Sequence, residues 1–382
     1  MEPTGSNAFA IELWSRVRGT GGNLAVAPAG ITLALAMTWG GARGDTAHEM
    51  KQVLHFEGSA EEVMDSAGQL LQAWNASAGP SLLRVANRLF GAKEFTFEKP
   101  YLEKTRAAFG APLEPVDFDA GVEATRQSIN AWVARQTEDR IPELLPAGSL
   151  KPKLTKLVLV NAVYFKASWA TPFPEQSTET EPFFVTRTQK KQVPLMHRTG
   201  DYRFVQTDGV KVLEVPYEGR ELAMIFVLPE KAGGLEDVER SLTSTQLEEW
   251  IGALGRERVN VALPRFEVRP EGSIELGEAL AAMGMGRAFD PDEADFTGMA
   301  NPTLPRERLH ISEVFHQAFV KVDEKGTEAA AATAAVMMSR TMAMRPREPK
   351  DFRADHPFLF FLRDSASGMI LFMGRVADPQ SR

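Results

Sequence analysis

The sequence predicts an α+β fold in a single domain that spans residues 1–382, and three observations lead to this fold class. Segments with strand patterns and segments with helix patterns are mixed along the chain, without the regular alternation of a parallel α/β protein. Neither a sharp change of composition nor an internal repeat divides the chain. Of its 382 residues, 43% are hydrophobic and 25% are charged, which is enough to bury a substantial core.

In the N-terminal half, helices are expected where apolar residues recur every three or four positions. The expected elements, in order, are a helix at 7–17, a strand at 24–26, a helix at 28–39, a turn and helix at 41–50, a helix at 60–75, a strand at 82–90 and a helix at 127–138. The glycine-rich residues 19–23 end the first helix, and Pro28 opens the second. The run at 157–173, LVLVNAVYFKASWATPF, is rich in β-branched residues and indicates a buried strand.

The C-terminal half has mostly strand patterns. The expected elements, in order, are strands at 181–194, 212–217 and 221–229, helical patterns at 235–254, a strand at 259–268, a helix at 276–285, a strand at 314–322 and a closing hairpin of 357–362 and 368–376. Segment 289–299 contains Asp290, Asp292, Glu293 and Asp295 but lacks the glycine and terminal glutamate of an EF-hand. We therefore expect a solvated acidic turn there and no metal site.

Composition excludes several classes of function. The chain has no cysteine, which removes thiol catalysis and disulfides, and its formal net charge of −8 disfavours nucleic acid as a partner. No apolar run approaches the ~20 residues of a spanning helix, so no membrane partner is expected. The N-terminus has no signal-peptide pattern, so we expect a cytoplasmic protein, or a secreted one whose signal is missing from this chain.

Motifs for enzyme catalysis are absent as well. The sequence contains no G-x-S-x-G elbow, no H-E-x-x-H, no P-loop and no dinucleotide-binding glycine motif, and its six histidines are scattered singly. We therefore expect no enzyme activity and no cofactor.

The most unusual stretch is FHQAFVKVDEKGTEAAAATAAVMMSR, residues 315–340. Local propensity favours a helix over residues 326–335, but that helix would bury almost nothing. In an extended conformation, alternate side chains from Thr327 to Ala335 would share one face, and all of them are small and uncharged. Such a segment could stay exposed and later enter a sheet as an extra strand without overpacking the core.

Two segments carry a resemblance to a known family. Residues 323–335, DEKGTEAAAATAA, resemble the hinge of an inhibitory serpin, and residues 352–362, FRADHPFLFFL, resemble the segment that follows a serpin reactive loop. Similar segments extend from about residue 7 to residue 379. The resemblance implies about eight or nine helices around three β-sheets, with an exposed reactive-centre loop at about residues 324–350. A prokaryotic source is also expected.

The resemblance assigns roles to particular residues. The loop hinge would comprise Glu324, Gly326, Thr327, Glu328, Ala329, Ala330, Ala331 and Ala332. Asn161 matches the central asparagine of the main sheet, His316 matches its partner, and Trp169 matches the tryptophan near the place where the loop inserts. The chain departs from the family at Ala27 and Gly30, where serpins usually have serines that help to hold the centre of the sheet.

The resemblance also places the bond that a protease would cut. Counting from the hinge puts it at Arg340–Thr341, which suits a trypsin-like protease whose primary pocket holds an aspartate. Because the segment between Arg340 and Pro357 is longer than expected, counting from its far end moves the bond to Met342–Met344 and favours chymotrypsin-like or elastase-like targets.

The expected function is therefore inhibition of a serine protease by a suicide substrate, with a covalent acyl complex between the two proteins. The alternative is a non-inhibitory serpin-fold carrier, chaperone or storage protein. Heparin activation is not expected, because residues 60–75 include Glu61, Glu62 and Asp65 where heparin-controlled serpins have basic residues. We expect a monomer.

Overall fold

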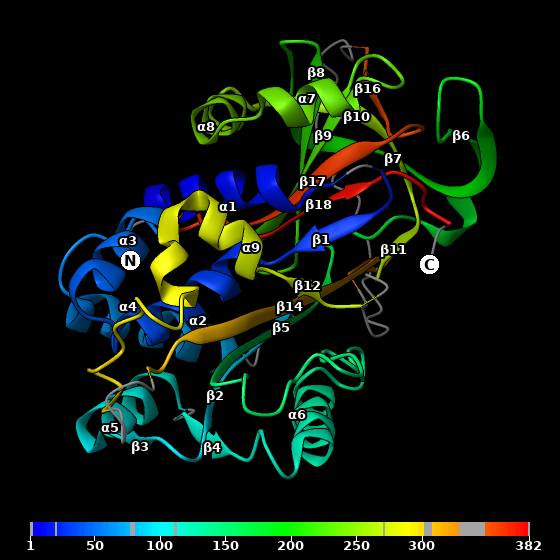
Figure 1. Cartoon of the computed structure of the whole chain (residues 1–382). Helices are drawn as coiled ribbons and strands as arrows, with labels where there is room; N and C mark the ends of the chain where they lie inside the picture. The colour runs from blue at the N-terminus through cyan, green and yellow to red at the C-terminus, as the bar shows by residue number, and fades with distance from the viewer. Residues whose placement is uncertain are drawn as a thin grey trace.

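The computed structural model describes residues 3–19, 21–76, 81–110, 113–269, 272–301, 308–327 and 348–380. Within these ranges the chain forms nine α-helices and three β-sheets (Figure 1). The helices are α1 (Pro3–Val17), α2 (Pro28–Trp39), α3 (Gly44–Val53), α4 (Ala60–Ala76), α5 (Lys99–Phe109), α6 (Val122–Gln136), α7 (Leu235–Ser241), α8 (Ser244–Gly252) and α9 (Gly277–Leu280).

The largest sheet has nine strands, in the order β1-β18-β17-β9-β8-β7-β10-β16, with β6 paired to β7. The strands are β1 (Leu24–Val26), β6 (Thr178–Phe184), β7 (Lys190–Thr207), β8 (Val210–Pro216), β9 (Leu222–Pro229), β10 (Gly255–Pro264), β16 (Lys350–Arg353), β17 (Phe358–Asp364) and β18 (Ile370–Val376). Strand β7 is long enough to pair with β6 over residues 190–196, with β10 over residues 195–204 and with β8 over residues 203–207. The expected closing hairpin is confirmed as the antiparallel pair β17 and β18.

The second sheet has seven strands, in the order β11-β14-β15-β5-β2-β4, with β12 beside β14. The strands are β2 (Ser81–Ala92), β4 (Glu114–Val116), β5 (Leu157–Ser168), β11 (Phe266–Val268), β12 (Ile274–Glu275), β14 (Ile311–Val322) and β15 (Gly326–Thr327). Strands β5 and β14 pair directly and in parallel, from Leu157 opposite Ile311 to Tyr164 opposite Phe319. We call this line of pairing the β5–β14 seam. A third sheet consists of β3 (Thr96–Phe97) and β13 (Ala300–Asn301).

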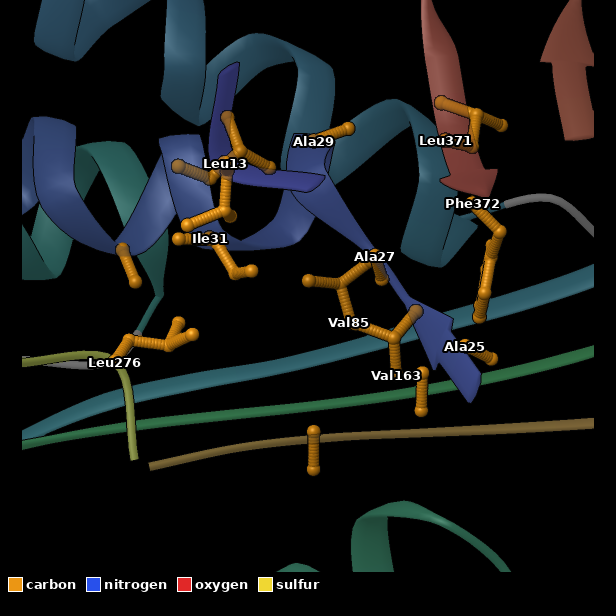
Figure 2. Close-up of a cluster of buried hydrophobic side chains, with 14 of the residues drawn as sticks. Leu13, Ala25, Ala27, Ala29, Ile31, Val85, Val163, Leu276, Leu371 and Phe372 are labelled. Atoms are coloured by element: carbon orange, nitrogen blue, oxygen red, sulfur yellow. The ribbon is translucent and has the colours of Figure 1, made fainter. Parts of the chain in front are cut away.

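Helix α2 is the centre of the molecule. Its sequence, PAGITLALAMTW, carries no charge, and every one of its residues is buried, as expected for a helix that is apolar all round. The start of α2 packs on Val85 of β2 and Val163 of β5, while Leu371 and Phe372 of β18 approach from the other large sheet (Figure 2). A single helix therefore joins the cores of both large sheets.

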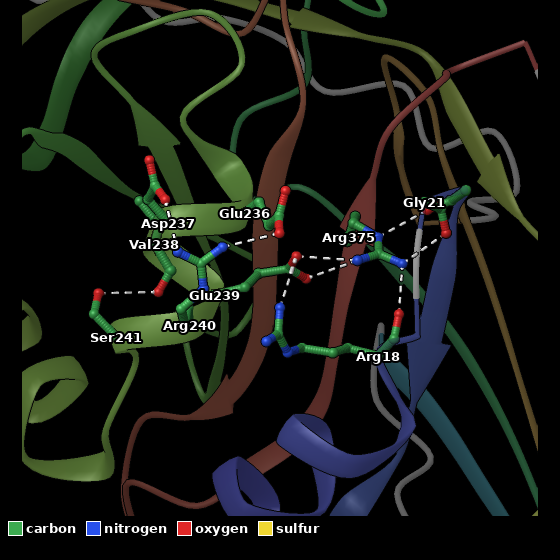
Figure 3. Close-up of polar contacts among 10 residues, drawn as sticks. Arg18, Gly21, Glu236, Asp237, Val238, Glu239, Arg240, Ser241 and Arg375 are labelled. Atoms are coloured by element: carbon green, nitrogen blue, oxygen red, sulfur yellow. Dashed lines mark hydrogen bonds and ion pairs between the residues drawn. The ribbon is translucent and has the colours of Figure 1, made fainter.

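A buried ion cluster ties the two ends of the chain together (Figure 3). Both nitrogen-to-oxygen distances between Arg375 Nη1 of β18 and the Glu239 carboxylate of α7 are 3.0 Å, and both side chains are buried. The same guanidinium donates hydrogen bonds to the backbone carbonyls of Arg18, Gly21 and Gly22. These carbonyls belong to the turn that follows α1, so Arg375 fastens this turn to β18.

The expected elements agree with the structure in type, and two differences have local causes. The helical pattern at 235–254 is two helices, because the Thr243 side chain accepts a hydrogen bond from the Gln246 N–H and starts α8 anew. Helix α5 was not predicted, although Pro100 near its start and Gly110 at its end, with φ of 66°, mark both boundaries. In the described ranges, no helix combines the length and the apolar character that crossing a membrane requires.

Candidate functional site

A tight hairpin at the end of β14 sets the position of the predicted hinge. The Asp323 carboxylate accepts hydrogen bonds from the N–H groups of Lys325, at 2.9 Å, and Gly326, at 3.3 Å. Gly326 has φ of +150°, and a Cβ atom there would lie 2.0 Å from the carbonyl oxygen of Ala167. Only glycine fits at this position, because both the backbone angle and the neighbouring strand exclude a side chain.

After Gly326 the chain turns into the seam. Strand β15 lies between the ends of β14 and β5, and the Thr327 side chain within it is fully buried. The hydroxyl groups of Thr327 and Tyr217 are 2.6 Å apart. Trp169 stacks on the Tyr217 ring, with centroids 4.4 Å apart, and its indole N–H donates to the Asp323 carbonyl. The start of the hinge is thus already seated in the sheet.

A charged contact holds the hairpin from its other side. The Glu324 carboxylate, whose side chain is only 5% exposed, lies 2.6 Å from Nη2 of Arg265 and also accepts a hydrogen bond from the Thr178 hydroxyl. Burial raises the pKa of Glu324, but the hydrogen bonds from Arg265 and Thr178 outweigh it and hold the pKa below its ordinary value. Glu324 therefore stays ionised and fastens the hairpin to β6 and to the end of β10.

In the middle of the seam, a chain of hydrogen bonds crosses three strands. The Ala27 N–H donates to Nε2 of His316 at 3.1 Å, so Nδ1 carries the ring proton and donates to the Asn161 side-chain oxygen at 2.6 Å. The Asn161 amide donates to Asn87, whose own amide donates to the Gly30 carbonyl at 3.0 Å. We call this chain of five residues the seam relay. It starts and ends on backbone groups at the N-terminus of α2.

The seam relay accounts for the two positions that depart from the family. A Cβ atom at Gly30 would lie 2.7 Å from the Asn161 side-chain nitrogen, so this chain has no room for a serine there. Backbone groups of Ala27 and Gly30 bond with His316 and Asn87 in place of the missing hydroxyls. Complete burial lowers the pKa of His316 to about 3, so its ring is neutral at physiological pH.

Of the thirteen predicted site residues, the structure describes six, and it places five of them along the seam and Glu324 in the hairpin at its end. Asn161 and His316 face each other at its centre, while Trp169, Gly326 and Thr327 lie at its end. The remaining hinge residues Glu328, Ala329, Ala330, Ala331 and Ala332, the bond Arg340–Thr341 and the alternatives Met342–Met344 lie outside the described residues.

Four contributing residues were missed in the sequence: Asn87, Thr178, Tyr217 and Arg265. Asn87 left a signal, because it interrupts an alternating apolar face that also contains Val85 and Leu89. The other three residues left no such signal in the sequence, because each lies near the end of a strand and is distant in sequence from the residue that it contacts. The expectation of a solvated acidic turn at Asp290 agrees with its side chain accepting local N–H groups. In the described part of the chain, no three His, Cys, Asp or Glu side chains are grouped to hold a metal ion.

Comparison with known proteins gives a consistent result. The family model described as "Serpin (serine protease inhibitor)" matches residues 4–379. The chain is 41% identical over 363 residues to Serpin B6 of Macaca fascicularis, covering 94% of this chain and 93% of the relative. It is 38% identical over 381 residues to the human leukocyte elastase inhibitor, covering 97% of each.

Solved structures extend the similarity to the fold. The crystal structure of human thyroxine-binding globulin complexed with its hormone has a TM-score of 0.87 at 29% identity, covering 99% of this chain and 98% of that one. This agreement confirms the expected α+β architecture of nine helices and three sheets in the described ranges. The similar proteins are mostly eukaryotic, so the expected prokaryotic source finds no support.

Proposed function

The chain belongs to the serpin family, and from this premise we propose that it inhibits a serine protease as a suicide substrate whose reactive bond is Arg340–Thr341. Its named relatives include protease inhibitors, which places the chain with serine protease inhibitors and not with enzymes. The target that an arginine before the bond favours is a trypsin-like protease.

The observation that carries this proposal is the position of β15. Thr327 is buried between β14 and β5, while further along the seam these two strands still pair directly with each other. The hinge thus enters the sheet at the end of the β5–β14 seam. Beyond Thr327 the sequence continues as EAAAATAA, whose small side chains suit insertion into a packed sheet.

The mechanism requires no catalytic group in this chain. The protease serine attacks the carbonyl carbon of Arg340, the bond to Thr341 breaks, and an acyl ester links the two proteins. Insertion of the cleaved loop then carries the ester along the seam before water can hydrolyse it. Thirteen residue steps separate Thr327 from Arg340, so at ~3.3 Å per residue the protease moves roughly 43 Å. Distortion of the protease at its new position leaves the ester stranded, and the kinetically trapped starting state supplies the driving force.

The position of the reactive bond has an alternative within the same mechanism. A bond within Met342–Met344 would direct the inhibitor to chymotrypsin-like or elastase-like proteases. The relative named leukocyte elastase inhibitor makes this alternative worth a direct test. No activating heparin, nucleic acid or second subunit is needed for either version, and we expect the inhibitor to act as a monomer.

A non-inhibitory serpin-fold carrier, chaperone or storage protein is the competing function, since the similar structures include one titled as a complex with thyroxine. Bulky, charged or proline residues in the hinge would favour it. Between Gly326 and Ala335 the only such residue is Glu328, whose side chain would point to the opposite face from Thr327 in a strand. The hinge composition therefore supports inhibition.

The test is to mix the protein with trypsin, boil the mixture in detergent, separate it by electrophoresis and measure intact masses. We expect a band near the summed mass of both proteins and a released peptide that begins at Thr341. Arg340→Ala should abolish this complex, whereas the matched variant Arg345→Ala should retain it. A complex with elastase and a peptide that begins at Ala343 or Met344 would move the bond and keep the mechanism. Cleavage by trypsin, chymotrypsin and elastase without any complex would overturn the proposal in favour of the non-inhibitory protein.

A further inference from the structure

A pocket of about 530 Å³ opens away from the seam, where β7, β8, β10 and the end of β17 come together. Its volume is within the range of small-molecule sites in proteins. Five arginines line it: Arg198, Arg203, Arg220, Arg256 and Arg363. We call it the arginine pocket. Such a concentration of positive charge is unexpected in a chain whose net charge is −8.

Two carboxylates among the lining residues neutralise only part of this charge. Glu214 lies 2.9 Å from a guanidinium nitrogen of Arg203, and Asp201 lies 3.2 Å from one of Arg256. Five arginines against two carboxylates leave three positive charges in the pocket. Within the described residues, the guanidinium groups of Arg220 and Arg363 make neither a hydrogen bond nor an ion pair. They are therefore free to bind an anion.

Tyr202 forms part of the wall of the arginine pocket. Its side chain lines the pocket, and the residue is only 6% exposed. Its hydroxyl oxygen is buried, so a ligand in the pocket would meet the ring and not the hydroxyl group.

The neighbouring backbone leaves room for the guanidinium groups of the pocket. Arg198 lies over the Tyr202 ring, with its guanidinium carbon 5.7 Å from the ring centroid. A Cβ atom at Gly368 would lie 2.9 Å from a terminal nitrogen of Arg363, so the glycine leaves the space that this guanidinium occupies. Arg363 thus reaches the pocket from β17, and Arg220 reaches it from the exposed turn between β8 and β9.

We propose that the arginine pocket binds a small oxyanion with two or more negative charges, such as a phosphate or sulfate ester, through the guanidinium groups of Arg220 and Arg363. Guanidinium groups match the geometry of phosphate and sulfate oxygens and can bind two of them at once. Three unbalanced positive charges suit a ligand with several negative charges better than a single carboxylate. The volume of the pocket allows the anion to be part of a larger molecule.

Isothermal titration calorimetry of the full chain tests this site with two probes, inositol hexakisphosphate and sucrose octasulfate, and with uncharged inositol as the control ligand. We expect one probe molecule to bind per chain, at 50 mM salt, and to bind more weakly at 200 mM. Tyr202→Phe should bind like the unaltered protein, because the hydroxyl group is out of reach of the ligand. The double variant Arg220→Ala/Arg363→Ala should weaken it by more than about thirtyfold.

The control variant is Arg106→Ala, which removes one exposed positive charge from α5, outside the pocket. It should bind like the unaltered protein. Binding of only one probe would support the site and assign its ligand to that class of ester. Absence of binding by both probes at millimolar concentration would overturn the proposal. Unchanged binding by the double variant, or an equal loss with Arg106→Ala or Tyr202→Phe, would also overturn it. Because Tyr202→Phe removes an unpaired hydroxyl, it should not lower the melting temperature, and its binding result is interpretable.

Discussion

Replacing Thr327 with arginine tests the insertion step of the proposed mechanism directly. Thr327 is fully buried, and the Tyr217 hydroxyl is its hydrogen-bond partner. The nearby carboxylate of Glu324 is already paired with Arg265, so a guanidinium group at position 327 would be buried without a counter-charge. Burial of an unpaired charge costs about 3–5 kcal/mol. An arginine at this position therefore keeps the start of the hinge out of the sheet before cleavage, so insertion must bury it, and even ~3 kcal/mol added to that barrier slows the step by about 150-fold.

This slowing decides the fate of the acyl ester. If insertion normally outpaces deacylation by about tenfold, a 150-fold slower insertion lags behind it by roughly fifteenfold. Fewer than about one in ten encounters would then end in a trapped complex. The assay is incubation with trypsin, followed by denaturing electrophoresis and densitometry of three species: intact inhibitor, cleaved inhibitor and complex. We expect Thr327→Arg to be cleaved at the same bond as the unaltered protein but to yield mostly cleaved chain.

Two matched variants distinguish the effect of a buried charge at position 327 from a general disruption of the hinge. Thr327→Ser keeps the hydroxyl that bonds to Tyr217 and should form complex normally. Lys325→Arg places a guanidinium two residues earlier, where the lysine side chain is 44% exposed, and should also form complex normally. The reasoning fails if Thr327→Arg is cleaved and still gives the full yield of boiling-resistant complex.

Three further predictions concern stability and the hinge. Because the pKa of His316 falls from its unfolded value of about 6.5 to about 3 in the folded protein, stability is full above pH 6.5 and is lost as pH falls. The loss amounts to about 2 kcal/mol between pH 7 and pH 5, measured by urea unfolding. Arg375→Met leaves the buried carboxylate of Glu239 with only its 3.8 Å ion pair to Arg18 and should lower the free energy of unfolding by about 3–5 kcal/mol, also measured in urea. Gly326→Ala places a methyl group against the Ala167 carbonyl, so it should displace the hairpin and reduce the yield of protease complex.

Each of these has its own control and its own contrary outcome. His316→Gln should remove the 2 kcal/mol contribution to the acid slope, and an unchanged slope would assign it to other groups. The double variant Arg375→Met/Glu239→Leu should be less damaging than Arg375→Met alone, and equal damage would mean that the charge left behind is unimportant. Gly209 also has positive φ, but open space surrounds its Cα. If Gly209→Ala reduced complex formation as much as Gly326→Ala, the contact with Ala167 would not be the cause.

The sequence predicted one part of the site, because the residues of that part lie in local sequence patterns. The apolar run that became β5 predicts a buried strand, and the small residues after Gly326 predict an inserting segment. Asn161, Trp169 and His316 followed from the resemblance to serpins, and the structure places all three along the seam.

The other half depends on residues that only the fold brings together. Tyr217 contacts Thr327 across 110 positions of the chain, and Asn87 contacts Asn161 across 74. Arg265 follows the end of β10, and its sequence context is that of an ordinary exposed arginine. Its pairing with Glu324 is evident only in the folded structure. No periodic pattern in the sequence predicts such pairs, because the turns and the strand order between the two residues determine which side chains come into contact. The sequence showed the departure from the family's serines at Ala27 and Gly30, but it did not show that backbone groups take the place of the missing hydroxyls.

The seam relay also determines how easily mutation can damage the centre of the sheet. Its two terminal partners are the Ala27 N–H and the Gly30 carbonyl, and every residue type except proline supplies an N–H, while every residue type supplies a carbonyl. A network closed by serine side chains would offer five positions where a single substitution deletes a hydrogen-bonding group. This one offers three: Asn87, Asn161 and His316. Fewer single mutations can therefore weaken the centre of the sheet by deleting a hydrogen-bonding group, while position 30 remains sensitive only to the size of its side chain.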